Sequence, residues 1–124
     1  MAKHAPTVPR LDERVFLVVA YDGPDSEATR DDALEGHLDY IERHCERYLA
    51  CGPLHAPDRS RLIGSFFLVS ASDADDARRF LNGDPYLDSG MYASIDVHEA
   101  TVAGGRWMGG VIWESAEQVR AAQS

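Results

Sequence analysis

The sequence predicts one α+β domain with the element order βαββαβ, in which two helices cover one face of a four-stranded antiparallel sheet. Two segments carry the β-branched and aromatic residues of strands, and two others carry apolar residues at helical spacing. The length of 124 residues leaves room for a single domain. Apolar residues make up 44% of the chain and charged residues 27%, a balance that excludes a wholly disordered protein.

The first half of the chain predicts a strand followed by a long helix. Residues 15–21 are mostly β-branched or aromatic, and Asp22-Gly23-Pro24 ends this strand in a turn. Between Ala28 and Leu49, apolar residues recur at steps of three and four, which is the stripe of an amphipathic helix. The stripe consists of Leu34, Leu38, Ile41, Cys45 and Tyr48 or Leu49.

The middle of the chain predicts a weak strand, a strong strand and a second helix. Gly52-Pro53 ends the first helix, and residues 49–55 allow a short extended segment before a polar loop. Residues 63–71 form a strong strand. Ser72-Asp73-Ala74-Asp75 then resembles the capping box that opens a helix, and Asn82-Gly83-Asp84-Pro85 closes that helix.

The last predicted element is the strand at residues 91–102, where apolar and polar residues alternate. The complete order is that of a ferredoxin-like fold. We expect residues 1–12 to be a flexible tail, residues 13–102 to be the domain, and residues 103–124 to be a C-terminal extension.

Two of the predicted strands, at residues 15–21 and 63–71, are apolar on both faces. The helices can bury only one face of the sheet, so the other face needs a cover. A bare face would expose a larger apolar patch than soluble monomers usually carry. We therefore expect a homodimer packed sheet to sheet, and the alternative is that the C-terminal segment folds back over this face.

Charge and composition exclude several classes of partner. Lys and Arg number 12 against 21 Asp and Glu, giving a formal net charge of −9 that repels nucleic acid and anionic lipid. The longest apolar run is too short to cross a membrane, and the polar N-terminus lacks the apolar core of a signal peptide. Cys45 and Cys51 are read as reduced thiols, so we expect a cytoplasmic protein.

Among the five histidines, His37 has the most informative position. It follows Leu34 by three residues and precedes Ile41 by four, so its ring lies at the edge of the apolar stripe and can reach a pocket. Arg30 and His44 lie seven residues away on either side, along the same line of the helix. The alternative, which spacing alone favours, is a half-buried histidine without a role in chemistry.

Asp84 marks the end of the second predicted helix, between Gly83 and Pro85. The following proline favours an extended backbone at Asp84, so the carboxylate projects from a stiff corner. The alternative is a turn aspartate whose carboxylate bonds its own backbone, and the residues alone favour this alternative.

Four short motifs follow one another along the chain. They are Arg30…His37-Leu38-Asp39-Tyr40-Ile41, Cys51-Gly52-Pro53-Leu54, Gly64-Ser65-Phe66-Phe67 and Asp84-Pro85-Tyr86. In order and spacing, this set resembles the YCII-related family of small bacterial proteins. The resemblance covers residues from about 15 to 102. The N-terminal tail and the segment after residue 102, with Trp107 and Trp113, are additions to the family pattern.

The resemblance implies a ferredoxin-like fold, a homodimer and a pocket with a histidine–aspartate pair, which His37 and Asp84 match by position. It also implies a reaction class, because some proteins similar to this family act as dehalogenases (dehydrochlorinases) in the breakdown of chlorinated aromatics. We expect the small-molecule substrate to contact a second set of residues: Arg30, Gly52, Pro53, Ser65 and Tyr86.

A carboxylate that accepts the hydrogen of one imidazole nitrogen fixes the tautomer and leaves the other nitrogen free to take a proton. We therefore expect a cofactor-free, lyase- or dehalogenase-like enzyme acting on a small organic substrate, anionic or halogenated. We expect no metal and no dinucleotide, because the spacing of histidines and glycines fits neither site. The alternative is a non-catalytic dimeric module that binds a small ligand or accompanies a larger enzyme.

Overall fold

The computed structural model describes residues 3–123, and the chain divides into two compact units. Residues 13–100 form the first unit, called here the main domain. The residues before position 13 and after position 100 form the second, called here the terminal unit. No helix within residues 3–123 is long and apolar enough to cross a membrane.

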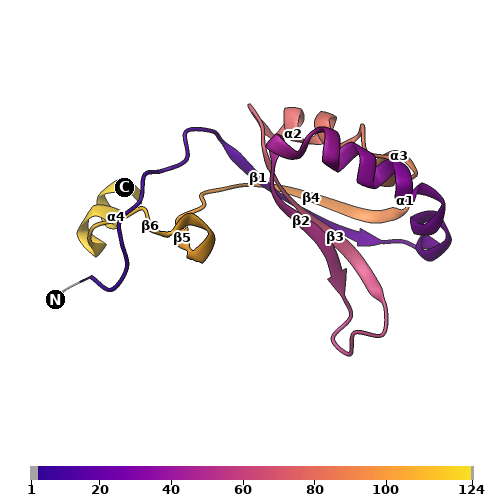
Figure 1. Ribbon diagram of the computed structural model, residues 1–124, viewed down its shortest axis with the longest axis horizontal. Helices are drawn as coiled ribbons and strands as arrows, with labels where there is room; N and C mark the ends of the chain where they lie inside the picture. Colours follow the sequence, from indigo (N-terminus) through magenta and orange to yellow (C-terminus); the bar gives the residue numbers. More distant parts are fainter. Residues whose placement is uncertain (1–2, 124) are drawn as a thin grey trace. The chain divides into compact units, whose positions relative to one another are not determined.

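The main domain contains a four-stranded antiparallel sheet with the strand order β2-β3-β1-β4 (Figure 1). The strands are β1 (Val15–Asp22), β2 (Tyr48–His55), β3 (Leu62–Ser70) and β4 (Tyr92–Ala100). β1 lies between β3 and β4. Its alternating side chains Phe16 and Val18 are fully buried, as is expected for a central strand. The predicted α+β class is confirmed.

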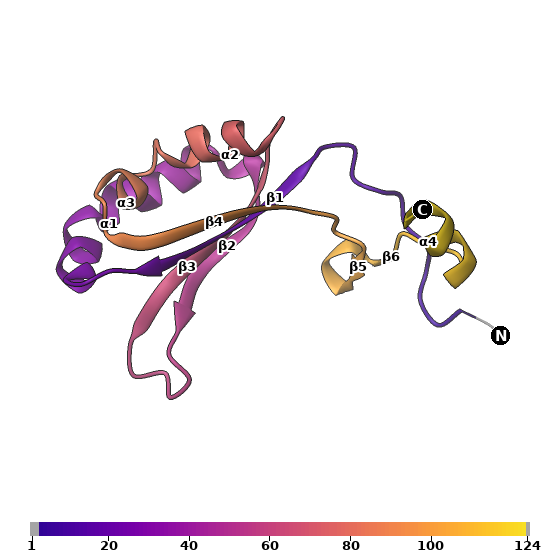
Figure 2. The ribbon, with the colours of Figure 1, turned by 180° about the vertical axis from the view of Figure 1, so that it is seen from behind.

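Three helices lie on one face of this sheet, as Figure 2 shows. They are α1 (Ser26–Arg43), α2 (Ala74–Leu81) and the short α3 (Pro85–Asp88). The sequence predicted two helices, and α3 is the addition. It forms because Asp84 caps it through a hydrogen bond from the Tyr86 N–H, 2.9 Å long, while Pro85 occupies the first turn.

The first helix differs from its prediction in length and in the face that it turns to the core. α1 ends at Arg43, and a 3₁₀ turn at Cys45–Arg47 leads directly into β2. Leu34 and Leu38 of the predicted apolar stripe are 41% and 47% exposed. The side chains of α1 that pack against the core are Ala33, Tyr40 and Ile41, of which only Ile41 belongs to the predicted stripe.

Contact with α3 explains this rotation of α1. A side chain at Gly36 would lie 2.9 Å from the Cγ of Pro85, so the two helices approach each other where glycine leaves room. The helical face around Gly36 and His37 therefore points at α3 rather than at solvent.

A β-bulge changes which side chains of β4 face the helices. Ala20 pairs with Ile95, but Asp22 pairs with Tyr92, so Ala93 is an extra residue in β4. Tyr92 and Ile95 both pack against the core, although simple alternation predicts them on opposite faces. Asp22 continues the alternation of Phe16, Val18 and Ala20 on the helix-covered side of the sheet, and the bulge brings its partner Tyr92 to the same side.

The face of the sheet away from the helices is apolar in its centre. The side chains of this face on β1 and β3 alternate with the fully buried ones and remain half-buried within the main domain. They are Leu17, Val19, Phe66 and Leu68.

The terminal unit pairs the two ends of the chain. Its elements are the two-residue strands β5 (Gly104–Gly105) and β6 (Gly110–Val111), a 3₁₀ turn at Arg106–Met108, and α4 (Ala116–Gln123). The Val8 N–H donates to the Val111 carbonyl, and the Val111 N–H donates to the Pro6 carbonyl. The residues expected to form a tail therefore lie beside β6.

Candidate active site

The packing of α1 on α3 brings together the two residues expected to form a pair. The Nδ1 atom of His37 lies 2.9 Å from Oδ1 and 2.7 Å from Oδ2 of Asp84. The Asp84 side chain is fully buried, whereas 13% of the His37 side chain is exposed. Because a buried carboxylate requires hydrogen-bond donors, the hydrogen of the imidazole belongs on Nδ1, and Nε2 is left as an acceptor.

Two further contacts fix this pair. Asp84 Oδ1 accepts the Tyr86 N–H, so the same carboxylate both caps α3 and meets His37. Both interpretations of Asp84 drawn from the sequence thus describe real contacts. The Tyr86 ring stacks on the imidazole with ring centroids 3.7 Å apart and planes 6° from parallel.

The glycine before Asp84 sets the distance between α1 and this corner. A side chain at Gly83 would lie 2.8 Å from ring carbons of Tyr40, which belongs to α1. The Tyr40 hydroxyl in turn donates a hydrogen bond to the Phe80 carbonyl at the end of α2. Glycine at position 83 is therefore needed for α1 to approach closely enough for His37 to reach Asp84.

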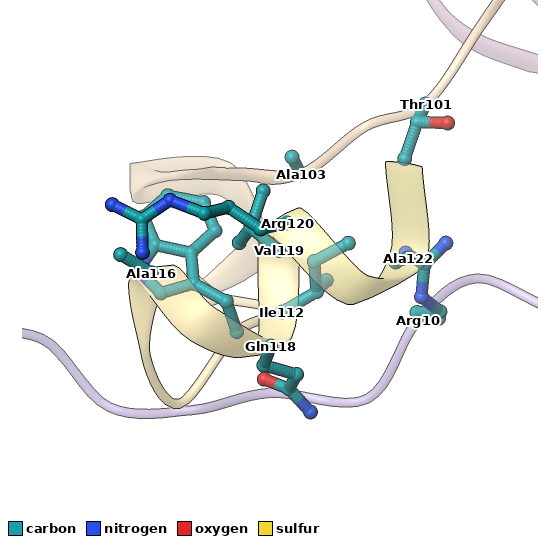
Figure 3. Close-up of a pocket in the computed structure, with 10 residues that line it drawn as sticks. Arg10, Thr101, Ala103, Ile112, Ala116, Gln118, Val119, Arg120 and Ala122 are labelled. Atoms are coloured by element: carbon teal, nitrogen blue, oxygen red, sulfur yellow. The ribbon is translucent and has the colours of Figure 1, made fainter. Parts of the chain in front are cut away.

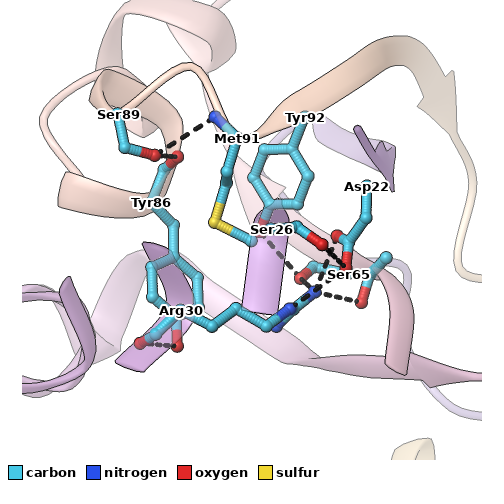
Figure 4. Close-up of polar contacts among 9 residues, drawn as sticks. Asp22, Ser26, Arg30, Ser65, Tyr86, Ser89, Met91 and Tyr92 are labelled. Carbon is cyan, nitrogen blue, oxygen red and sulfur yellow. Dashed lines mark hydrogen bonds and ion pairs between the residues drawn. The ribbon is translucent and has the colours of Figure 1, made fainter. Parts of the chain in front are cut away.

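Arg30 lies about two helical turns before His37, and its side chain connects α1 to the end of β1. Its guanidinium donates to both carboxylate oxygens of Asp22, at 2.9 and 3.2 Å, and to the Gly64 carbonyl at 2.9 Å (Figure 4). Burial lowers the pKa of Arg30, but the hydrogen bond and the charge of Asp22 outweigh it and raise that pKa. Arg30 is thus a neutralised, two-point ion pair rather than a free cation.

Hydroxyl groups extend this polar network toward β3 and β4. The hydroxyls of Ser65 and Tyr92 lie 2.8 Å apart, and the Tyr86 hydroxyl donates to the Arg30 carbonyl. Figure 4 shows Tyr86 and Tyr92 with Arg30 reaching between them toward Asp22. Burial raises the pKa of Tyr92 to about 12, so its hydroxyl stays neutral through the physiological range.

An open cleft of about 550 Å³ adjoins this network. Tyr86 and Arg30 form part of its wall, so the ring that stacks on His37 also faces the cleft. His37 itself is not part of the wall. The remaining lining residues are Asp22, Ser26, Glu27, Asp31, Leu34, Ser60, Arg61 and Leu62.

The structure brings most, but not all, of the expected site residues together. His37, Asp84 and Tyr86 are in mutual contact, and Arg30 contacts both Ser65 and Tyr86. The two other expected residues are on the edge strand β2. Gly52 faces Phe66 on the side of the sheet away from the helices, whereas Pro53 is exposed and pairs with Ser65. Within residues 3–123, no three His, Cys, Asp or Glu side chains cluster as a metal site would.

Sequence reasoning missed three residues of the network. Asp22 was read only as a turn residue, and Ser26, whose hydroxyl donates to Asp22, was not singled out. The available signal was the even spacing of Asp22, Ser26 and Arg30, four residues apart from the end of β1 into the start of α1. Tyr92 had no such signal, because its place depends on the bulge in β4.

Comparison with known proteins identifies the family of the chain. A family model described as the YCII-related domain matches residues 15–101. The chain belongs to the YCII-related family. The matched span covers residues 15–100 of the main domain and only Thr101 of the terminal unit. No curated protein matches the sequence significantly.

Among solved structures, one similar protein is the 5-chloro-2-hydroxyhydroquinone dehydrochlorinase TftG from Burkholderia phenoliruptrix AC1100, in complex with 2,5-dihydroxybenzoquinone. It is 27% identical, with a TM-score of 0.62, and the match covers 75% of this chain and 97% of TftG. Two others are 12% identical: MtbAldR, with a TM-score of 0.47 and coverage of 77% and 59%, and PA3566 from Pseudomonas aeruginosa, with 0.42 and coverage of 80% and 97%.

The raised pKa of Tyr92 predicts a loss of stability at alkaline pH. A tyrosine in the unfolded chain has a pKa of about 10, so the stabilisation is complete below that pH and is lost as pH rises toward about 12. Because Tyr92 is only partly buried, we expect this loss to be about 1 kcal/mol between pH 8 and 11. Urea unfolding should show that Tyr92→Phe removes this part of the pH dependence.

The matched control for this measurement is Tyr21→Phe, which alters an exposed tyrosine of the same sheet. It should leave the alkaline loss of stability as large as in the unchanged protein. An equal alkaline loss in the Tyr92→Phe and unchanged proteins would contradict the burial of the Tyr92 hydroxyl.

Proposed function

We propose that this protein is a cofactor-free enzyme that removes HX, such as hydrogen chloride, from a small hydroxylated ring, with His37 as the general base. The contact of His37 Nδ1 with the fully buried Asp84 carries the proposal, because it leaves Nε2 free to take a proton. The similarity to a dehydrochlorinase supports the reaction class. The strand order supports the expected ferredoxin-like topology.

In the proposed reaction, the substrate reacts as a keto tautomer, in which one ring hydroxyl has given its proton to the halogen-bearing carbon and that carbon is tetrahedral. Nε2 of His37 then takes a proton from a remaining ring hydroxyl, or from a carbon next to the carbonyl. The electron pair released forms a new double bond, and the carbon–halogen bond breaks to release halide. Asp84 stabilises the imidazolium that results, which then returns its proton to water. The substrate loses one proton and one halide, so no oxidant or cofactor is required.

The proposal assigns substrate contacts to Arg30, Ser65 and Tyr86. Because Asp22 neutralises Arg30, the groups that the site offers to a substrate are an ion pair and hydroxyls, and not an unpaired positive charge. Such groups suit hydroxyl and carbonyl oxygens on a ring better than a strongly anionic group. The anionic substrate expected from the sequence is therefore the weaker choice.

We further propose that a second copy of the chain covers the apolar face of the sheet. Leu17, Val19, Phe66 and Leu68 are half-buried there, and the main domain itself offers nothing to cover them. A two-fold dimer would pack each patch on its copy.

The catalytic assignment predicts the effect of His37→Asn on elimination from a chlorinated hydroxyquinol. We expect kcat/KM for chloride release to fall by roughly 10²–10⁴-fold, because the base is removed, while the far-ultraviolet circular dichroism stays unchanged. His44→Asn, which alters the residue directly after the same helix, is the control and should retain activity, since the His44 ring contacts Tyr40 and Phe80. Full activity in the His37→Asn protein would remove His37 from the mechanism.

Failure to find any turnover with ring substrates, combined with tight binding of a hydroxyquinone in the cleft, would favour the alternative of a non-catalytic binding module. In that case His37→Asn would change the affinity for the hydroxyquinone, and there would be no turnover for the variant to lose.

The dimer proposal predicts that Val19→Arg separates the copies, because an arginine in the apolar sheet face has no partner there. Sedimentation velocity should give twice the mass of one chain for the unchanged protein and the mass of one chain for the variant. Leu38→Arg, at an exposed position of α1, is the control and should sediment as the unchanged protein does. A Val19→Arg protein that keeps the dimer mass would place the interface elsewhere.

A further inference from the structure

A hollow lies in the terminal unit, and apart from Thr101 the residues that line it fall outside the span that the family model matches. It is an open cavity of about 890 Å³ between α4, the segment before β5 and the residues after β6 (Figure 3). Its wall is mainly apolar, with Ile112, Trp113 and Val119 as the large side chains. This volume is in the range of small-molecule sites.

The charge of this cavity differs from that of the rest of the chain. Two arginines, Arg10 and Arg120, are part of its wall, and no carboxylate is. Figure 3 shows these two side chains at opposite ends of the hollow. Within residues 3–123, neither of them forms an ion pair with an acidic side chain.

The two units of the chain differ in their balance of acidic and basic side chains. The main domain carries eighteen acidic and eight basic side chains, whereas the terminal unit carries three acidic and four basic ones. The open cleft beside Arg30 and Tyr86 is acidic like the main domain around it, since Asp22, Glu27 and Asp31 lie in its wall. The wall of the terminal cavity thus attracts an anion through two arginines and has no carboxylate to repel it.

The terminal unit also lacks a core of its own. No apolar side chain of its described residues is fully buried, and Trp113, Ile112 and Val119 remain half-buried around the cavity. A molecule in the cavity would remove apolar surface from water, which stabilises both the complex and the unit.

We propose that this cavity binds an elongated apolar organic acid, whose chain lies against Ile112, Trp113 and Val119 and whose carboxylate pairs with Arg10 or Arg120. The site is separate from the His37–Asp84 pair, and the proposal does not depend on the proposed elimination reaction.

Trp113 provides a direct signal for binding. The second tryptophan, Trp107, is 85% exposed and outside the cavity wall, so Trp107→Phe isolates the fluorescence of Trp113. In that background, octanoate should shift the Trp113 emission to shorter wavelength in a saturable way. Octylammonium, with the same chain and the opposite charge, should bind at least several-fold more weakly. Affinity should rise up to about fourfold for each added CH₂ between hexanoate and decanoate.

Variants then test the two arginines. Because both side chains are exposed, Arg10→Gln and Arg120→Gln should each weaken octanoate binding by about 1.5- to 5-fold. Arg106→Gln removes a cation of the same unit that lies outside this cavity wall, and it should leave the affinity unchanged. Circular dichroism checks that each variant keeps its fold.

Several outcomes would overturn the proposal. Equal binding of octanoate and octylammonium, or an affinity that does not change with chain length, would show that no apolar cavity with cationic ends is present. If Arg106→Gln weakened octanoate binding as much as Arg120→Gln does, the effect would come from the net charge of the protein and not from an arginine in the cavity wall. A Trp113 emission that depends on protein concentration, and not on octanoate, would show that a second copy fills the cavity instead.

Discussion

A fully buried carboxylate that must be given hydrogen-bond donors is the constraint on which the helix-covered half of this protein depends. Asp84 has no access to water, so its oxygens must be satisfied by the Tyr86 N–H and by Nδ1 of His37. These two donors come from α3 and α1. The carboxylate therefore fixes how the two helices meet, and the close approaches at Gly36 and Gly83 let them do so.

The same constraint links fold to chemistry. A ring held by a carboxylate on one edge and by Tyr86 on its face has one tautomer and one orientation, which a general base needs before substrate arrives. The Arg30–Asp22 pair has a parallel role at the other end of α1, where it joins the helix to the end of β1 and the start of β3. Two polar anchors thus hold α1, a helix without a fully buried side chain of its own.

The sequence was sufficient to predict the order of elements and the meeting of His37 with Asp84, since the strands are strongly apolar and the motif set is specific. It was insufficient wherever tertiary contacts override local pattern. The leucines of α1 predicted the wrong core face, because contact with α3 sets the rotation of the helix. The position of Tyr92 depends on a bulge that alternation does not reveal. Gly52 was expected at the site through a family motif, but alternation along β2 turns it to the opposite face of the sheet, where it pairs with Phe66, while its neighbour Pro53 pairs with Ser65.

The tautomer of His37 tests the central claim most directly. Long-range ¹H–¹⁵N correlation spectra of the neutral imidazole distinguish a protonated Nδ1 from a protonated Nε2. The account predicts that Nδ1 carries the hydrogen in the unchanged protein, because Asp84 accepts it, and that Asp84→Ala allows the mixture of tautomers found for free histidine. A His37 ring protonated at Nε2, or one whose tautomer is the same with and without the Asp84 carboxylate, would contradict it.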